Sequence, residues 1–286
     1  MPRRRVSSHQ ADIDRLTLEA EVWRREAEAL IALAGPSPSA RCLEACCGPL
    51  GALAALAEAA PDGHVVGVEA DPELAAEARR EVARRRLGNV TVVTDDLLEF
   101  RQPELFDLAY MRFAPVSLGR PGRRMLEALR SLCLPGGAVL MQEPFGAFHY
   151  AGSESGALEK LLALATAAYH AEGVDMHAGR RLSSRLAAAG LTDVVERRAR
   201  VALPAGHPYL RLPVMLADAL GDAILDLGTV APADLRELRR LAEHEAAAPA
   251  LRATTFELVG AVGRVPLIGR ATDPHRATQS STVVST

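Results

Sequence analysis

The chain has 286 residues, which is enough for one large α/β domain or for a domain with a modest cap. Apolar residues make up 49% and charged residues 24% of the chain, a composition typical of a soluble globular protein. The formal net charge of −3 gives no electrostatic reason to expect a polyanion, so we expect no nucleic-acid partner.

The cysteines do not predict a disulfide framework, because they are few and clustered: Cys42, Cys46, Cys47 and Cys133. None stands in a Cys-x-x-Cys pair and the histidines lack zinc-site spacing, so we expect no metal. No apolar run approaches the roughly 20 residues that span a bilayer, and no apolar segment of a secretory signal follows the N-terminal arginines. We therefore expect a cytoplasmic protein without a membrane partner.

The two ends of the chain, residues 1–10 and 270–286, are polar and without hydrophobic period, and we expect both to be disordered. Residues 11–35 have the pattern of one long helix that ends at Gly35, and its apolar stripe comprises Leu16, Ala20, Trp23, Ala27 and Leu30. This helix packs on the domain in the simplest interpretation. The alternatives are a lid or an element of a homodimer.

From residue 36 to 269, short apolar segments alternate with segments of helical period. The predicted strands are RCLEA (41–45), HVVGVEA (64–70), VTVVTDD (90–96), FDLAYMRF (106–113), AVLMQEP (138–144) and a last strand at 254–265. This alternation predicts an α/β fold with a doubly wound, mostly parallel sheet. Two further helical regions, 151–178 and 205–250, are expected to form a cap with the N-terminal helix over the C-terminal edge of the sheet, where such sheets bind ligands.

The first strand ends at Glu44 and is followed by the turn CCGPLG (46–51), which opens a helix. Glycines at a helix N-terminus let backbone N–H groups approach a polar ligand. The second strand ends in Glu69, 21 residues after Gly48, close to the spacing of an acid that binds a ribose. The two features together predict a site for a nucleoside-type cofactor.

Five blocks in this order resemble the class I S-adenosylmethionine (SAM)-dependent methyltransferases: EACCGPLG (44–51), VVGVEADPEL with Glu69, VTVVTDDLLEF with Asp96, FDLAYMRF and LPGGAVLMQEP (134–144). The resemblance covers about residues 41–144 and implies a Rossmann-like sheet of seven strands with SAM as cofactor. The sequence departs from the family at Cys46, which stands where the first glycine of the loop is usual. A Cβ there is expected to lie close to both backbone and cofactor.

By that resemblance, Glu44 and the loop hold the methionine part of SAM, Glu69 binds the ribose, and Asp96 binds the adenine with the Leu97 backbone beside the ring. The end of the fourth strand lies near the methyl group. The cofactor-binding residues predicted in this way are Glu44, Cys46, Gly48, Gly51, Glu69, Asp96, Leu97, Met111 and Arg112.

Methyl transfer to oxygen or nitrogen often needs a general base, and histidine suits neutral pH. His149 lies just past the fifth strand and is the first candidate. Tyr150 and Glu143 are the other predicted catalytic residues, and His170 and His177 are weaker candidates on the inserted helix and its following turn.

The resemblance and the apolar cap predict a methyltransferase that acts on an O, N or C atom of a small, partly hydrophobic molecule. Residues 173–191 are similar to actinobacterial methyltransferases, which indicates natural-product biosynthesis. One alternative is an enzyme of the same fold that catalyses a non-methylating cyclisation or rearrangement. The other is a non-catalytic binding or assembly protein.

Overall fold

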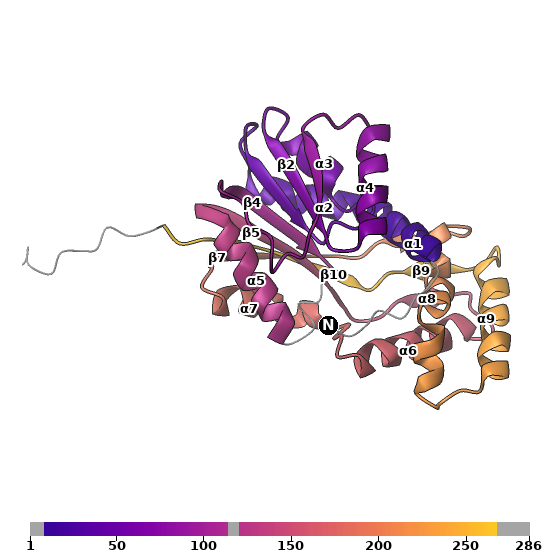
Figure 1. Cartoon of the computed structure of the whole chain (residues 1–286). Coiled ribbons are helices and arrows are strands. Elements are labelled where there is room, and N and C mark those ends of the chain that lie inside the picture. Colours follow the sequence, from indigo (N-terminus) through magenta and orange to yellow (C-terminus); the bar gives the residue numbers. More distant parts are fainter. Residues whose placement is uncertain (1–8, 114–119, 268–286) are drawn as a thin grey trace, which may run out of the picture.

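The computed structural model describes residues 9–113 and 120–267 (Figure 1). The segments expected to be disordered, 1–10 and 270–286, lie outside these residues, except that His9 and Gln10 begin the first helix. One sheet runs through the molecule with helices on both faces, and further helices gather beside one end of it (Figure 1). This arrangement confirms the predicted α/β fold with a helical cap.

The central sheet has seven strands in the order β3-β2-β1-β4-β5-β10-β7. Neighbours from β3 to β5 are parallel, whereas β10 is antiparallel to both β5 and β7. The strands are β1 (Arg41–Ala45), β2 (His64–Glu69), β3 (Val90–Thr94), β4 (Phe106–Arg112), β5 (Cys133–Phe145), β7 (Thr192–Ala199) and β10 (Glu257–Arg264). Runs such as VVGV in β2 are buried because helices cover both faces of the sheet.

Two hydrophobic layers enclose the sheet. One face packs against α2 (Arg24–Ala34), α3 (Leu53–Ala59) and α4 (Pro72–Arg84). The other packs against α5 (Arg120–Leu132) and α7 (Leu182–Ala188), which follows a short helix, η2 (Ala178–Arg181). The Asp71 side chain caps α4 by accepting hydrogen bonds from the N–H groups of Glu73 and Leu74, so this helix starts directly after the end of β2.

The single long helix predicted at 11–35 is divided at Trp23 into α1 (His9–Val22) and α2. The Trp23 ring is fully buried and stacks on Phe256 with ring centroids 5.1 Å apart. The two halves have different neighbours, because α2 packs on the sheet while α1 contacts α8 and α4. Because the helix is interrupted at the buried Trp23, the apolar stripe of α1 packs on the cap and that of α2 packs on the sheet. Dimerisation through this helix stays a prediction.

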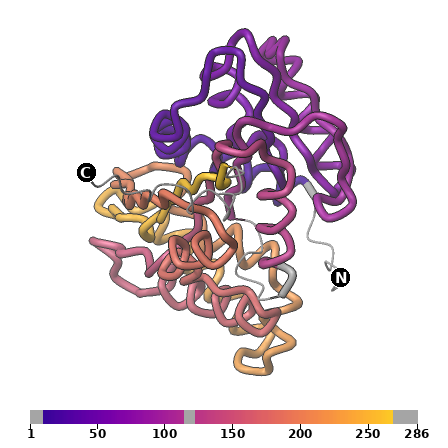
Figure 2. Tube along the Cα trace, turned by 90° about the vertical axis from the view of Figure 1, so that its left-hand side faces the viewer, coloured from indigo at the N-terminus to yellow at the C-terminus, as the bar shows by residue number. Residues whose placement is uncertain are grey.

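The cap is formed by α1, α6 (Ala157–Ala171), η3 (Pro208–Arg211), α8 (Leu212–Asp226) and α9 (Pro232–Ala246). In Figure 2 the cap helices from the later part of the chain, α6, α8 and α9, in pink to orange, lie below the indigo and purple N-terminal half. Glu245 of α9 fixes the start of α6 by accepting N–H groups of Ser155 and Leu158 at 3.0 Å. Burial acts to raise the pKa of Glu245. These hydrogen bonds, together with one from Ser153, outweigh burial and lower the pKa to about 2.

Four strands were missing from the sequence prediction. The edge strand β7 is largely exposed and rich in charge, so it lacks the apolar run that marks the other strands. A small sheet of β6 (His149–Ala151), β9 (Arg252–Thr254) and β8 (Ala202–Leu203) closes the base of the cap. Its strands have at most three residues, too short for a period-2 pattern to be visible.

Candidate cofactor-binding and active site

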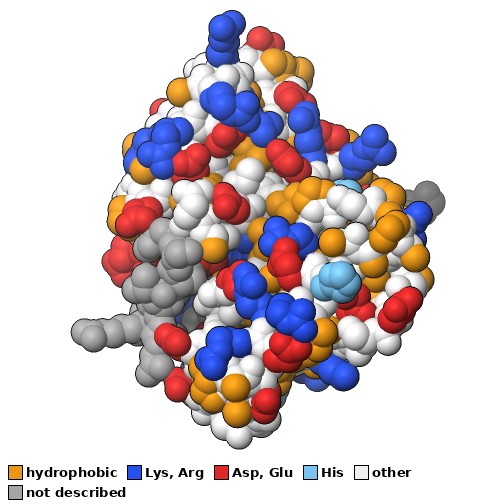
Figure 3. All heavy atoms as spheres, turned by 90° about the vertical axis from the view of Figure 1, so that its right-hand side faces the viewer, with side chains coloured by type: hydrophobic (Ala, Val, Ile, Leu, Met, Phe, Trp, Pro, Cys, Tyr) orange, Lys and Arg blue, Asp and Glu red, His pale blue; other side chains and the backbone are white. Residues whose placement is uncertain are grey.

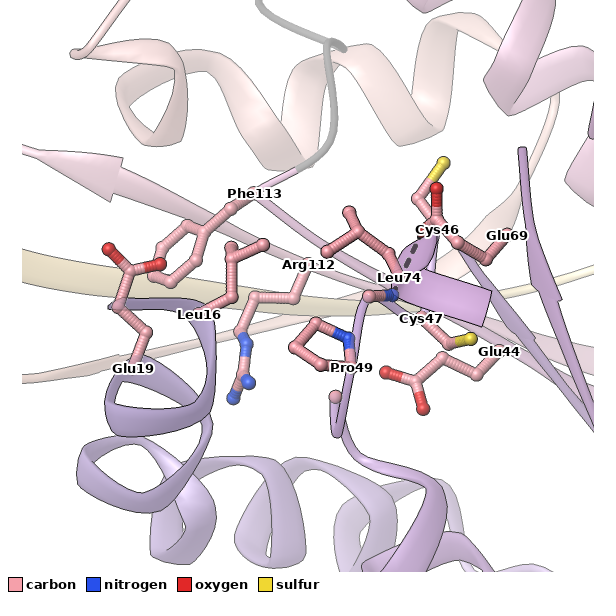
Figure 4. A pocket seen from close by; sticks show the side chains of 12 residues that line it. Leu16, Glu19, Glu44, Cys46, Cys47, Pro49, Glu69, Leu74, Arg112 and Phe113 are labelled. Carbon is pink, nitrogen blue, oxygen red and sulfur yellow. Dashed lines mark hydrogen bonds between the residues drawn. The ribbon is translucent and has the colours of Figure 1, made fainter. Parts of the chain in front are cut away.

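A cavity of about 310 Å³, hereafter the loop cavity, lies at the C-terminal edge of β1, β2 and β4 (Figure 4). This is the edge at which open parallel sheets bind ligands. Its lining residues come from the turn after β1, the strand ends and helix α1: Leu16, Glu19, Glu44, Cys46, Cys47, Gly48, Pro49, Gly51, Glu69, Leu74, Arg112 and Phe113.

The turn after β1 has three residues with left-handed backbone: Cys46 (φ 54°), Gly48 (φ 56°) and Gly51 (φ 49°). Glycine adopts this conformation at little cost, whereas a side chain is strained in it. At Gly51 an added Cβ would overlap the carboxylate of Glu44 and lie 2.6 Å from the Cys47 carbonyl oxygen. Gly51 is therefore required, and Cys46 holds the glycine-like backbone at a cost in strain.

Glu44 is buried at the end of β1, with 2% of its surface exposed. Its Oε1 accepts the N–H of Ala52 at 2.6 Å, while Oε2 is buried and has no hydrogen-bond partner among the described residues. Burial raises the pKa of Glu44 to about 8, against the lowering effects of the Ala52 N–H and Arg112. The cavity thus holds a carboxyl group with one oxygen available to a ligand donor.

Arg112 ends β4 and lines the same cavity. Its Nη1 is buried without a hydrogen-bond partner in the described part of the chain. In Figure 4 the Arg112 guanidinium and the Glu44 carboxylate lie on either side of the loop at Pro49, and both line the cavity. An unpartnered cation donor and an unpartnered carboxylate oxygen in one cavity suit a zwitterionic amino-acid group.

Glu69 is 9% exposed at the end of β2 and fixes the geometry of the turn. Its Oε2 accepts the N–H of Gly48 and its Oε1 accepts the N–H of Asp71, both at 2.9 Å (Figure 4 draws the bond to Gly48). A carboxylate oxygen can accept a second hydrogen bond, so Glu69 can bind a pair of hydroxyls while holding the loop.

The thiols of the loop are suppressed as nucleophiles. Burial, followed by the charges of Glu69 and Asp96, raises the pKa of Cys46 to about 12. Burial and the nearby acids also raise the pKa of Cys47 well above its usual value. Since the thiolate is the reactive form, these two residues act as small packing groups.

The remaining predicted cofactor residues lie outside the loop-cavity lining. Asp96 lies half-buried after β3 and accepts the N–H of Leu98 at 2.9 Å. Its charge is one of the causes that raise the pKa of Cys46. Leu97 is 3% exposed in the hydrophobic core, and Met111 is fully buried there. The structure therefore brings together Glu44, Cys46, Gly48, Gly51, Glu69 and Arg112, and places Asp96 beside them.

A second cavity, of about 340 Å³, lies between the sheet edge and the cap and is hereafter the cap cavity. It shares Leu16, Glu19 and Phe113 with the loop cavity, so the two adjoin. Its other lining residues come from α1, β5, α6 and the turn after it, α8 and the residue before β10. They are Arg15, Glu143, Pro144, Tyr169, Glu172, Val174, Asp175, Met176, Leu212, Leu216 and Phe256.

Of the predicted catalytic residues, Glu143 lines the cap cavity, whereas His149 and Tyr150 line neither of the two cavities described. Glu143 is 2% exposed, and its Oε1 is buried without a hydrogen-bond partner in the described structure. Burial raises the pKa of Glu143 well above its usual range, with Arg185 acting to lower it and Asp175 to raise it. A buried carboxyl group with a raised pKa can act as a general base or a general acid.

The other catalytic candidates lie elsewhere. His149 is exposed on β6, and Tyr150 packs on Phe148 inside the cap with ring centroids 5.8 Å apart. Burial raises the pKa of Tyr150 above its usual value. His170 is exposed on α6, and His177 is exposed after it, where its Nδ1 accepts the N–H of Gly146.

Sequence reasoning missed the contributions of α1 and of the turn after α6. Leu16 was visible as part of an apolar stripe, but the stripe does not indicate that one residue faces a cavity. Glu19, Glu172 and Asp175 look like surface acids in the sequence, and only the tertiary arrangement brings them together.

Comparison with known proteins agrees with this geometry. Residues 42–137 match the family model of a methyltransferase domain. The chain is similar in structure to the YcgJ protein of Bacillus subtilis, with a TM-score of 0.57, 13% identity and coverage of 86% of this chain and 100% of that one. It is also similar to phosphoethanolamine N-methyltransferase 2 of Haemonchus contortus in complex with S-adenosylhomocysteine, with a TM-score of 0.52, 15% identity and coverage of 88% of this chain and 57% of that one. No curated protein sequence matches the chain.

The family-model match over residues 42–137 and the seven-stranded fold support a SAM-dependent methyltransferase with SAM as cofactor. The loop cavity fits SAM, because the unpartnered Glu44 Oε2 and Arg112 Nη1 match the charged groups of its methionine part.

Across residues 9–113 and 120–267, no helix has both the length and the apolar character needed to cross a membrane. Over the same residues, no three His, Cys, Asp or Glu side chains are grouped as metal ligands would be.

Proposed function

We propose that the protein transfers the methyl group of SAM to a small, partly hydrophobic molecule held in the cap cavity. The observation that carries this proposal is the junction of the two cavities at Leu16, Glu19 and Phe113. One cavity has the groups that suit SAM, and the other has apolar walls and the buried carboxyl group of Glu143. A methyl donor and an acceptor held in adjoining cavities are aligned for an in-line displacement.

The loop-cavity residues bind and orient the cofactor in this proposal. Glu44 pairs with the ammonium group of the methionine part and Arg112 with its carboxylate, while Glu69 accepts the ribose hydroxyls. Asp96 binds the adenine beside the Leu97 backbone, as the family resemblance implies. When bound, SAM supplies an electrophilic methyl group on a sulfonium, so these residues need only hold it still.

Glu143 is the proposed general base. Its burial favours the protonated form, which makes the carboxylate a stronger base than an exposed glutamate. Phe113 and Leu16 exclude water between the two cavities. His149 and Tyr150 stay predicted catalytic residues, but their positions on β6 and inside the cap make Glu143 the better candidate.

The biological setting is also a proposal. The resemblance of residues 173–191 to actinobacterial natural-product methyltransferases supports a cytoplasmic role in secondary-metabolite biosynthesis. The apolar lining of the cap cavity by Leu212, Leu216 and Phe256 supports an acceptor with a hydrophobic part.

The test is to incubate the purified protein with SAM and a panel of small amines, alcohols and phenols, and to measure S-adenosylhomocysteine release and product mass. We expect one acceptor class to gain a CH₂ unit with equimolar release of S-adenosylhomocysteine. A product of unchanged mass without that release would contradict methyl transfer and favour the cyclisation or rearrangement. Absence of SAM binding would contradict both.

A further inference from the structure

Among the charged residues that line the cap cavity, acids outnumber bases. We propose that this cavity selects a basic amine with an apolar body, held through Glu143, so that the acceptor atom is nitrogen. This inference rests on the proposed function, because it names the substrate class of the same site. It starts from a contrast: acidic and basic side chains are interspersed on the face shown in Figure 3, whereas the lining of the cap cavity has four acids and one arginine.

The single arginine of the lining is already neutralised. Arg15 donates to Glu19 at 3.0 Å and to Asp12 at 3.2 Å, and all three side chains lie on α1. The remaining acids of the lining are Glu143, Glu172 and Asp175. A carboxylate or phosphate group in this cavity would meet these acids, while the charge of the lining's arginine is already balanced by Glu19 and Asp12, so the cavity discriminates against anions.

Glu143 provides the second and independent observation. Its Oε1 is buried without a hydrogen-bond partner among the described residues, although buried polar groups are nearly always paired. The backbone around it is held closely, because a Cβ at Gly179 would lie 2.8 Å from the Glu143 carbonyl oxygen. A buried carboxyl group with an unpaired oxygen is suited to a ligand that brings a hydrogen-bond donor.

The charged groups near Glu143 favour a cation as that donor. Asp175 acts to raise the pKa of Glu143 and Arg185 acts to lower it, with burial as the largest influence. A positively charged ligand relieves both the burial cost and the repulsion from Asp175. A neutral alcohol would donate one hydrogen bond but would relieve neither.

The rest of the lining indicates an apolar body. Phe113 and Phe256 lie with ring centroids 5.9 Å apart, and Leu212, Leu216 and Met176 complete the apolar wall. Aromatic rings also attract cations through their faces. The matching ligand is a primary or secondary amine attached to an aromatic or aliphatic group.

The proton balance of the step follows from these groups. The ammonium form loses one proton to the Glu143 carboxylate, which leaves a neutral nitrogen with a lone pair. That lone pair forms the new N–C bond as the S–C bond to the methyl group breaks and its electron pair returns to sulfur. The products are the N-methylated ammonium, S-adenosylhomocysteine and protonated Glu143, which then loses its proton to solvent.

The experiment is a calorimetric titration with three probes of one shape at neutral pH: 2-phenylethylamine, 2-phenylethanol and 3-phenylpropionate. Each is added to the protein saturated with S-adenosylhomocysteine. We expect the amine to bind at least tenfold more tightly than the alcohol, and the carboxylate to bind most weakly. Glu143→Gln should reduce the amine preference to less than threefold, and Asp175→Asn should reduce it partially.

The matched control is Glu237→Gln, an exposed acid of α9 paired with Arg240 outside the cavity, which should keep the full preference. Thermal unfolding of each variant shows whether it is folded. Equal binding of amine and alcohol, no amine binding at millimolar concentration, or a preference kept in folded Glu143→Gln would overturn the inference. Failure of S-adenosylhomocysteine to bind in the preliminary titration would instead overturn the proposed function, and the probes added to the unliganded protein would still test the amine preference.

Discussion

The loop cavity and the cap cavity share three lining residues but are built in different ways. The loop cavity is shaped by backbone conformation within one turn, where Gly48 and Gly51 have left-handed φ and Glu44 and Glu69 accept backbone N–H groups. The cap cavity is shaped by side chains from segments far apart in the chain, including Glu143 of β5 and Phe256. The first is tied to the sheet, whereas the second depends on how the cap helices pack.

This difference predicts how each region tolerates change. A substitution in the turn must satisfy fixed backbone geometry, so a single methyl group is costly there. A side chain in the cap can be exchanged with smaller loss of stability, which lets acceptor specificity vary on a constant cofactor site. Substitutions at matched glycines separate the two situations.

The largest effect is expected for Gly51→Ala. The new Cβ would overlap the Glu44 carboxylate and lie 2.6 Å from the Cys47 carbonyl oxygen in a left-handed residue. Backbone strain and overpacking together predict a loss of about 2–4 kcal/mol in unfolding free energy. SAM affinity should fall by about tenfold or more, because a displaced Glu44 loses a charged hydrogen bond. Urea unfolding and calorimetry measure the two effects.

Gly156→Ala is the control for that substitution. Gly156 also has left-handed φ, at 64°, but an added Cβ would meet no atom within 4 Å. It should therefore cost only the backbone strain, about 1 kcal/mol, and leave SAM binding unchanged. Equal losses of stability and affinity in both variants would contradict the role given to the Gly51–Glu44 contact.

The second effect concerns pH. The pKa of Glu44 is raised by burial to about 8 from an ordinary value of 4.5, so the folded state binds a proton that the unfolded state has released. Stability is therefore greatest below that ordinary value and falls as pH rises towards the folded-state pKa, by up to about 1.4 kcal/mol per pH unit for one proton. Glu143 acts in the same direction.

Glu44→Gln removes this ionisation with little change of shape. Urea unfolding of the unliganded protein over a pH series should show a shallower decline for the variant than for the wild type. Asp62→Asn provides the exposed control and should keep the wild-type decline. Parallel declines in wild type and Glu44→Gln would mean that Glu44 is already ionised across this range.

A smaller effect is expected at Cys46, which has a φ of 54°. Cys46→Gly removes the strain of a left-handed side chain, whereas Cys46→Ala keeps it. The glycine variant should be more stable than the alanine variant by about 1 kcal/mol in urea unfolding. An alanine variant as stable as the glycine variant would show that the turn relaxes without cost.

The smallest effect is expected in the cap, at Gly221 of α8. Its φ is not left-handed and an added Cβ would meet nothing within 4 Å. Alanine is the better helix former, so Gly221→Ala should raise the unfolding free energy by about 0.5–1 kcal/mol. A loss of stability would indicate that α8 needs a backbone bend at this position, and circular dichroism with urea unfolding decides between the two.

The same contrast explains what the sequence could predict. Glu44, Gly48, Gly51 and Glu69 were found because the turn and the strand ends that position them lie within about one βαβ unit. Glu143 is also predicted from the sequence, but His149 ranks before it, because sequence distance from the fifth strand cannot show which side chain meets a cavity. The strand order and the cap cavity arise from long-range packing, as does the bend at Trp23 that separates α1 from α2.

The central claim is that the loop cavity binds SAM independently of the acceptor site, and one titration tests it most directly. SAM is titrated calorimetrically into the wild type, Glu69→Ala and Glu143→Gln, with thermal unfolding to show that each is folded. The account predicts micromolar binding by the wild type and by Glu143→Gln. Glu69→Ala should bind at least about tenfold more weakly, because it loses charged hydrogen bonds to ribose and loop. Wild-type affinity in folded Glu69→Ala, or no binding by the wild type, would contradict it.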